Sequence, residues 1–129
     1  MLKVNNAQDA VKAAKNYFTH PEQEECIIIC LNNRNEVKDI HFMALGSDTK
    51  VIMPKKNICK QAILDLASSV ILMHSHPSGD PSPSAADIHE TEALRKAMEI
   101  LDMSLIDHII LGKDSFFSFT ENMFNSINS

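Results

Sequence analysis

The chain has 129 residues, a net charge of −5 and an ordinary apolar fraction, which fit one globular domain with its own core. No apolar run approaches the length of a membrane span, and the first residues do not resemble a signal peptide. The acidic balance, without a basic block, argues against strong electrostatic binding of nucleic acid. Three cysteines without Cys-x-x-Cys spacing predict neither a disulfide framework nor a structural zinc site, so we expect a cytoplasmic protein.

The first half of the chain predicts a helix followed by a β-hairpin. Residues 5–18 carry apolar side chains at helical spacing, and the helix should end before Pro21. Residues 26–31 are apolar on both faces, which is typical of an interior strand. A polar turn at 32–35 then leads into a second strand at 36–45. We expect His41, in that strand, to be a partly exposed histidine without a ligand role.

The second half alternates between helices and strands. The expected elements are a short strand or loop at 48–53, a helix at 54–67, a strand at 69–73, a helix at 84–101, and strands at 104–111 and 115–119. Ile58, Ala62 and Leu66 should share the buried face of the first of these helices. This order of elements predicts a layered α/β domain.

The most informative stretch joins the strand at 69–73 to the helix at 84–101. His74 and His76 follow the strand two residues apart, so their side chains should point to one face. A loop rich in proline and glycine comes next, and Asp87 lies in the first turn of the following helix. Two imidazoles and one carboxylate suit Zn²⁺ with one coordination position left for water. An alternative is that Ser84 and Asp87 form only a helix capping box.

This stretch resembles a known metalloprotease motif. His74-x-His76, seven residues, Ser84, two residues and Asp87 is similar to the His-x-His-x7-Ser-x2-Asp motif of the JAMM (MPN+) zinc metalloproteases. The longer string His-Pro-Ser-Gly-Asp-Pro-x-Pro-Ser-x-x-Asp resembles the RadC branch of that superfamily, and the resemblance extends over residues 24–121. Ser75 is a departure, because RadC proteins usually carry asparagine there.

The resemblance implies a single α/β domain in which helices flank a mixed sheet, layered like the cytidine-deaminase fold. It also implies one Zn²⁺ held by His74, His76 and Asp87, and a hydrogen bond from Ser84 to the developing oxyanion. A glutamate outside the metal shell should act as general base. The apolar pattern cannot choose between Glu24 and Glu25, whereas the RadC spacing favours Glu24.

His108 belongs to an Asp-His-Ile-Ile string that also matches the RadC pattern. It lies either behind the metal ligands or against Asp107, and we favour the structural pairing with Asp107. His89 should be a surface residue, because its place on the helix turns it away from Asp87.

We therefore expect a zinc-dependent hydrolase that cleaves an amide or isopeptide bond in a peptide or protein. The alternative is a DNA-repair or mobile-element accessory protein that binds nucleic acid or a DNA-bound partner without peptidase turnover. We expect an N-terminal helix within residues 1–20, the metal-binding domain at 21–121 and a tail at 122–129. RadC-like proteins carry a helix-hairpin-helix module before the catalytic domain, and we expect that module to be absent here. Direct nucleic-acid binding should be weak, and the substrate and oligomeric state are left open.

Overall fold

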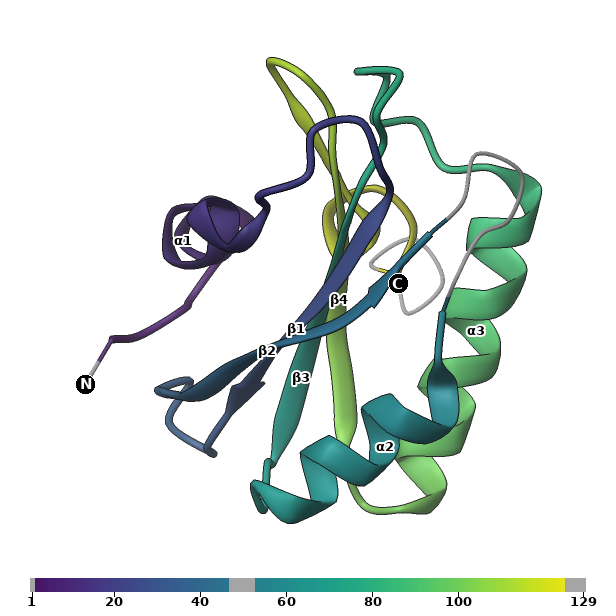
Figure 1. Cartoon of the computed structure of the whole chain (residues 1–129). Helices are drawn as coiled ribbons and strands as arrows, with labels where there is room; N and C mark the ends of the chain where they lie inside the picture. Colours follow the sequence, from purple (N-terminus) through teal and green to yellow (C-terminus); the bar gives the residue numbers. More distant parts are fainter. Residues whose placement is uncertain (1, 47–52, 125–129) are drawn as a thin grey trace.

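A five-stranded mixed sheet forms the centre of the molecule (Figure 1). The computed structural model describes residues 2–46 and 53–124, so the element expected at 48–53 lies almost entirely outside the described residues. The strand order is β2-β1-β3-β4-β5, with β1 at Glu25–Leu31, β2 at Val37–Leu45, β3 at Ser69–Ser75, β4 at Ser104–Leu111 and β5 at Phe116–Ser118. The expected α/β layering with a mixed sheet is confirmed.

The hairpin expected in the first half of the chain is present. β1 pairs antiparallel with β2 on one side and with β3 on the other. β1 is therefore an interior strand, which explains why all seven of its residues are buried. Between the strands, Asn35 takes a positive φ of 60°, a conformation that asparagine tolerates in tight turns.

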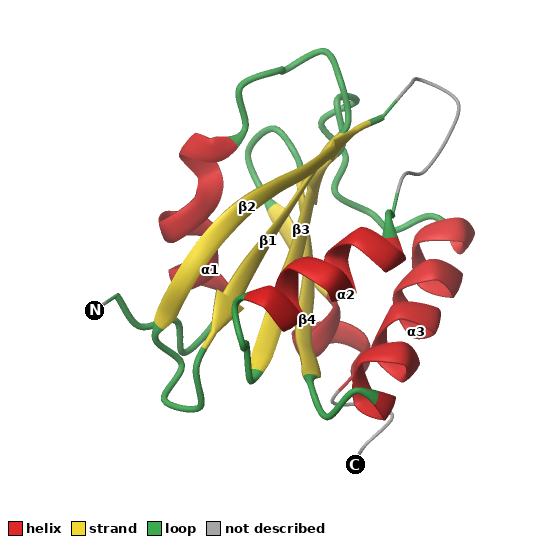
Figure 2. Ribbon diagram, turned by 60° about the horizontal axis from the view of Figure 1, so that its bottom comes forward, coloured by secondary structure: helices red, strands yellow, loops and turns green. Residues whose placement is uncertain are grey.

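A parallel crossover connects β3 to β4. The connection runs through the loop at 76–84 and helix α3 (Ala85–Ile100), which lies against the sheet (Figures 1 and 2). A parallel pair needs such a long connection, because a tight turn can join only antiparallel strands. The crossover therefore places the end of β3 and the start of α3 at the same edge of the sheet.

The sheet separates two apolar cores. Helix α1 (Ala7–Ala14), which continues into the short 3-10 helix Lys15–Tyr17, covers one face and packs on Ile27, Ile29 and their neighbours. Helices α2 (Lys55–Leu64) and α3 cover the opposite face (Figures 1 and 2). Alternate residues of β1 thus enter different cores, which accounts for a strand that is apolar on both sides.

Helix α2 is shorter than predicted, and one of its expected core residues is exposed. The helix ends at Leu64, and Leu66 lies beyond it with a φ of 53° and 79% of its surface exposed. Ile58 and Ala62 are buried as expected. The helical spacing failed at Leu66 because the backbone turns into the left-handed region just after the helix.

The last described element and the lengths of the helices complete the description of the fold. The described chain ends with a single π-helical turn at Thr120–Phe124. Among residues 2–46 and 53–124, the structure contains no helix with the length and apolar character needed to cross a membrane.

Candidate metal centre

Four side chains proposed from the sequence meet at the edge of the sheet where β3 ends. One donor atom each from Glu24, His74, His76 and Asp87 lies within 4.8 Å of the other three. The Nε2 atoms of His74 and His76 are 3.0 Å apart. These residues come from the segment before β1, from β3 and its end, and from the first turn of α3. The structure therefore brings together residues that are up to 63 positions apart in the chain.

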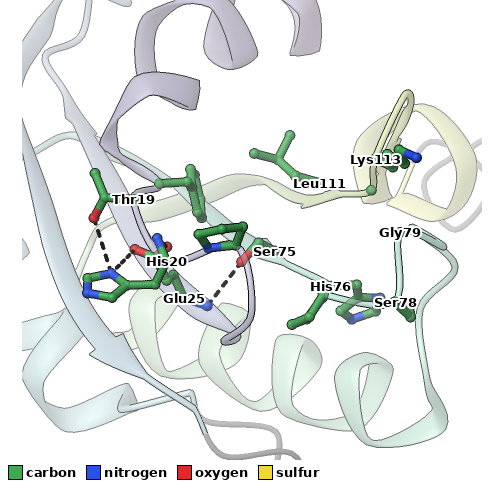
Figure 3. A pocket seen from close by; sticks show the side chains of 13 residues that line it. Thr19, His20, Glu25, Ser75, His76, Ser78, Gly79, Leu111 and Lys113 are labelled. Atoms are coloured by element: carbon green, nitrogen blue, oxygen red, sulfur yellow. Dashed lines mark hydrogen bonds and ion pairs between the residues drawn. The ribbon is translucent and has the colours of Figure 1, made fainter.

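Strand alternation places Glu24 at the cluster and Glu25 away from it. Cys26 pairs with His74 across β1 and β3, so Glu24, two residues before Cys26, shares the His74 face. Glu24 Oε1 lies 3.2 Å from His74 Nε2. Glu25 faces the opposite side, where its carboxylate accepts a hydrogen bond from the His20 amide and its own amide donates to Ser75 Oγ (Figure 3).

One carboxylate oxygen of Asp87 accepts a hydrogen bond in the helix cap, and the other has no hydrogen-bond partner. The Ser84 amide donates to Asp87 Oδ2 at 2.8 Å, and the Asp87 amide donates to Ser84 Oγ at 3.0 Å, which completes a capping box. Oδ1 is buried without a hydrogen-bond partner and lies 3.5 Å from His74 Nε2. A buried carboxylate oxygen without a partner is costly, and a cation between it and the imidazoles would satisfy it.

A buried hydrogen-bond chain determines which nitrogen of His74 carries the proton. Thr91 donates its only hydroxyl proton to the Asp87 carbonyl at 2.6 Å, so His108 Nδ1, also 2.6 Å from that hydroxyl, must donate to it. Burial lowers the pKa of His108 well below its usual value, and the neutral ring then accepts at Nε2. His74 Nδ1–H therefore donates to His108 Nε2 at 2.6 Å, which leaves the His74 Nε2 lone pair facing the cluster.

His108 accordingly lies behind His74, and the favoured pairing with Asp107 is wrong. The Asp107 carboxylate instead accepts hydrogen bonds from Ser118 and Thr120. His108 is fully buried, and its ring stacks on Phe119 with the centroids 4.7 Å apart and the planes at 7°. Sequence reasoning did not find Thr91, because a threonine in a helix carries no pattern that marks it as part of a site. His89 is exposed, as predicted.

His76 is oriented in the same way by the loop at 76–84, which we call the metal loop. Its Nδ1 lies 2.9 Å from the Asp80 carbonyl oxygen, which can only accept, so Nδ1 carries a proton. Nε2 consequently points to Asp87 Oδ2 at 3.3 Å. In both histidines a hydrogen bond holds Nδ1–H and presents Nε2, an arrangement typical of metal-binding histidines.

The electrostatics of the cluster keep His74 and Asp87 in forms that suit a metal, whereas His76 favours a proton. Burial lowers the pKa of His74 to about 4, so this ring is neutral near pH 7. Burial opposes the charge of Asp87, but hydrogen bonds from His76 and from the Ser84 amide outweigh it and hold its pKa well below the usual range. The hydrogen bond with Asp87 raises the pKa of His76, so an incoming cation competes with a proton there.

The pKa of Glu24 is raised, whereas that of the other carboxylate in the cluster, Asp87, is lowered. Burial raises its pKa, with the proximity of Asp87 adding to the effect and His76 opposing it. A carboxylate with a raised pKa holds a proton more readily near neutral pH, which is the property of a general base. The donor set thus fits a tetrahedral zinc site with two imidazoles, one aspartate and one open position, beside a glutamate that can move a proton.

A pocket of about 530 Å³ adjoins the cluster through His76. Figure 3 shows its wall formed by the segment around His20, the end of β3, the metal loop and the turn after β4. Gly112 makes the close approach of these last two segments possible. A Cβ atom there would lie 2.4 Å from the Gly79 carbonyl oxygen and 2.8 Å from Pro81 Cδ.

Comparisons with known proteins agree with the motif. A family model described as the RadC-like JAB domain matches residues 4–124. A UPF0758 protein of Chlorobaculum parvum is 34% identical over 120 residues, which cover 93% of this chain and 54% of that protein. UPF0758 proteins of Aquifex aeolicus and Shouchella clausii are each 36% identical, over 93% and 94% of this chain and 52% and 53% of theirs. The chain thus spans about half the length of these relatives, and it belongs to the RadC-like JAB-domain family.

Proposed function

We propose that this chain is a zinc-dependent hydrolase of the JAMM class that cleaves an amide or isopeptide bond. The observation that carries the proposal is Asp87 Oδ1, a buried carboxylate oxygen without a hydrogen-bond partner, beside two imidazole Nε2 atoms held in the metal-binding orientation. His74, His76 and Asp87 would hold the ion. When bound, Zn²⁺ would supply a Lewis acid and lower the pKa of a water molecule towards about 7.

Glu24 takes the role of general base in this proposal. Its carboxylate lies at the rim of the cluster, with Oε1 3.2 Å from His74 Nε2 and 4.0 Å from His76 Nε2. Its raised pKa suits a group that accepts a proton from the attacking water and returns it to the leaving nitrogen. Glu25 cannot share this role from its place on the opposite face of the sheet.

Ser84 is the proposed donor to the oxyanion. Its Oγ accepts the Asp87 amide, and a hydroxyl that accepts one hydrogen bond still has its own proton to donate. The side chain is therefore oriented by the helix cap and remains free to stabilise negative charge on the substrate. Removing one such donor at other sites costs about 3–4 kcal/mol of transition-state stabilisation.

The pocket beside His76 is the proposed substrate site. Its volume of about 530 Å³ lies within the range of small-molecule pockets, and His76 is the one residue assigned to the chemistry that lines it. Substrate bound there would be a peptide or protein segment. We also propose a cytoplasmic location, which the three free cysteines support.

The experiment that tests the proposal is Glu24→Gln in zinc-loaded protein, assayed against a broad panel of peptide and isopeptide substrates. We expect the variant to bind one zinc ion at this centre with nearly unchanged affinity and to lose turnover. Glu25→Gln is the matched control and should retain turnover, because Glu25 lies on the other face.

Full activity in Glu24→Gln would assign the base to another residue. If the wild-type protein cleaves nothing with zinc present, the hydrolase proposal fails. In that case salt-sensitive binding of DNA in gel shifts would instead support the accessory role.

A further inference from the structure

We infer that the chain has a second binding site for a divalent transition-metal ion, zinc by the chemistry of its donors, formed by Cys30, His41 and Asp65. The sulfur, imidazole and carboxylate donor atoms of these residues all lie within 4.8 Å of one another. The site is separate from the centre at the end of β3, shares no residue with it, and goes beyond the proposed hydrolase function. It gives His41 a ligand role that the sequence did not predict.

The three donors come from three elements and are brought together by the fold. Cys30 lies in β1 and His41 in β2, and both side chains point towards the α2 side of the sheet, because Cys30 belongs to that core and His41 pairs with Ile28 of the same core. Asp65 is the C-cap residue directly after α2. A shared ion would therefore tie the hairpin to the helix that covers it.

The orientation of the side chains is that of a prepared site. Gln61 Nε2 donates to Asp65 Oδ1 at 3.1 Å, which directs Oδ2 towards His41 Nε2 at 2.6 Å. Asp39 Oδ2 lies 3.8 Å from the same nitrogen, but Asp39 is outside the group of three whose donor atoms all lie within 4.8 Å of one another. Thiolate, imidazole and carboxylate oxygen are the ligand types that zinc prefers, and three such ligands leave the fourth tetrahedral position for water.

The local charge favours a cation. Asp65 stands at the C-terminus of α2, where the helix dipole already supplies partial negative charge. Asp39 adds a second carboxylate, and these two acidic groups outnumber Lys38, the basic side chain that also acts on the Cys30 thiol. The side chains of His41 and Asp65 retain 20% and 15% of their exposure, so two of the three donors can be reached from solvent.

Metal binding at this site requires the Cys30 thiol to lose its proton. Burial, together with the nearby Asp65 and Asp39 carboxylates, raises the pKa of the Cys30 thiol to about 12, so the metal-free protein holds this sulfur protonated. An incoming ion forms bonds to sulfur, to nitrogen and to oxygen, and it releases the thiol proton to solvent, while the His41 ring proton moves from Nε2 to Nδ1. The ion replaces the present hydrogen bonds that His41 and the Cys30 thiol make to Asp65.

Cobalt titration tests the inference, because the first centre contains no sulfur ligand. Co²⁺ bound to a thiolate gives a charge-transfer absorption in the near ultraviolet that Co²⁺ bound to nitrogen and oxygen does not. We expect wild-type protein to bind two equivalents of Co²⁺ and to show this band. His76→Ala, which removes a ligand of the first centre, should keep the band and bind one equivalent.

Variants at the second centre should give the opposite result. Cys30→Ser should lose the band and retain one equivalent, and His41→Ala should weaken the sulfur-bound ion at least about tenfold, the lower end of the loss seen when even outer-shell partners of a metal are removed. Cys26→Ser and Cys59→Ser are matched controls and should keep the band. Circular dichroism confirms that each variant is folded, and His41→Ala provides the test if Cys30→Ser is not.

Two results would overturn the inference. One is the absence of a thiolate band in folded wild-type protein at saturating Co²⁺. The other is a band that folded Cys30→Ser retains, or an affinity for the sulfur-bound ion that His41→Ala leaves unchanged. Neither result bears on the hydrolase proposal, which is tested by zinc binding and turnover at the other centre.

Discussion

Thr91→Val tests whether the buried hydrogen-bond chain behind His74 prepares the metal centre. Valine has nearly the shape of threonine, so the substitution removes a hydroxyl from a residue that is 1% exposed with little loss of packing. The hydroxyl donates to the Asp87 carbonyl and accepts from His108 Nδ1. Without it, His108 has no acceptor for its Nδ1 proton, and the preference for one tautomer disappears.

The expected losses of folding stability and of zinc affinity in Thr91→Val can both be estimated. A buried N–H left without a partner costs about 1–3 kcal/mol, which for a domain of this size lowers Tm by roughly 4 °C per kcal/mol. If the His108 proton moves to Nε2, two N–H groups face each other at His74, and the His74 proton shifts to the nitrogen that should bind zinc. Loss of such an outer-shell partner lowers metal affinity about 10- to 100-fold, or about 1.4–2.8 kcal/mol.

Zinc affinity is measured by competition with a chromophoric chelator, and the tautomers by ¹H–¹⁵N spectra of the imidazole nitrogens. Thr91→Ser is the matched control, because it keeps the hydroxyl and loses only a methyl group. We expect the serine variant to bind zinc like the wild type and the valine variant to bind it more weakly, with a changed His108 or His74 tautomer. Equal zinc affinity in Thr91→Val and the wild type would refute this reasoning.

Three further outcomes are expected. Zinc affinity should fall about tenfold per pH unit below the raised pKa of His76, because a proton then occupies the ligand nitrogen. A zinc affinity that calorimetry finds independent of pH would exclude His76 as a ligand. Asp87→Asn should weaken zinc binding by at least about tenfold but change unfolding stability by less than about 1 kcal/mol, since the amide oxygen can still accept from Ser84. Gly112→Ala should lower denaturation stability by about 1–3 kcal/mol, because its Cβ meets the Gly79 carbonyl; unchanged stability would show that the loop yields freely.

Much of the fold follows from local patterns in the sequence. The strand at β4 (Ser104–Leu111) and the turn after Leu31 were predicted at the right residues, because periodicity and turn residues act over short distances. The end of α2 was not predicted. Leu66 matches the helical spacing of Ile58 and Ala62, but nothing in its neighbourhood signals the left-handed turn that leaves it exposed.

The assignment of Glu24 shows where local reasoning ends. Adjacent residues of a strand face opposite sides, so the choice between Glu24 and Glu25 is a choice between the two faces of the sheet. Both faces of β1 are buried, so the apolar pattern of the strand does not indicate which face holds the site. The answer depends on the crossover through α3, which covers the Cys26 and His74 face and brings Asp87 to it.

The two interpretations of Asp87 that the sequence presents as rivals prove compatible. A capping box and a metal ligand both need a carboxylate in the first turn of a helix, and one pattern cannot separate them. In the structure the two oxygens divide the tasks: Oδ2 accepts the Ser84 amide, whereas Oδ1 remains buried and unpartnered beside His74. Because the cap fixes the carboxylate plane before any ion arrives, little side-chain entropy is left to lose on binding. The cap is thus part of what prepares the metal centre.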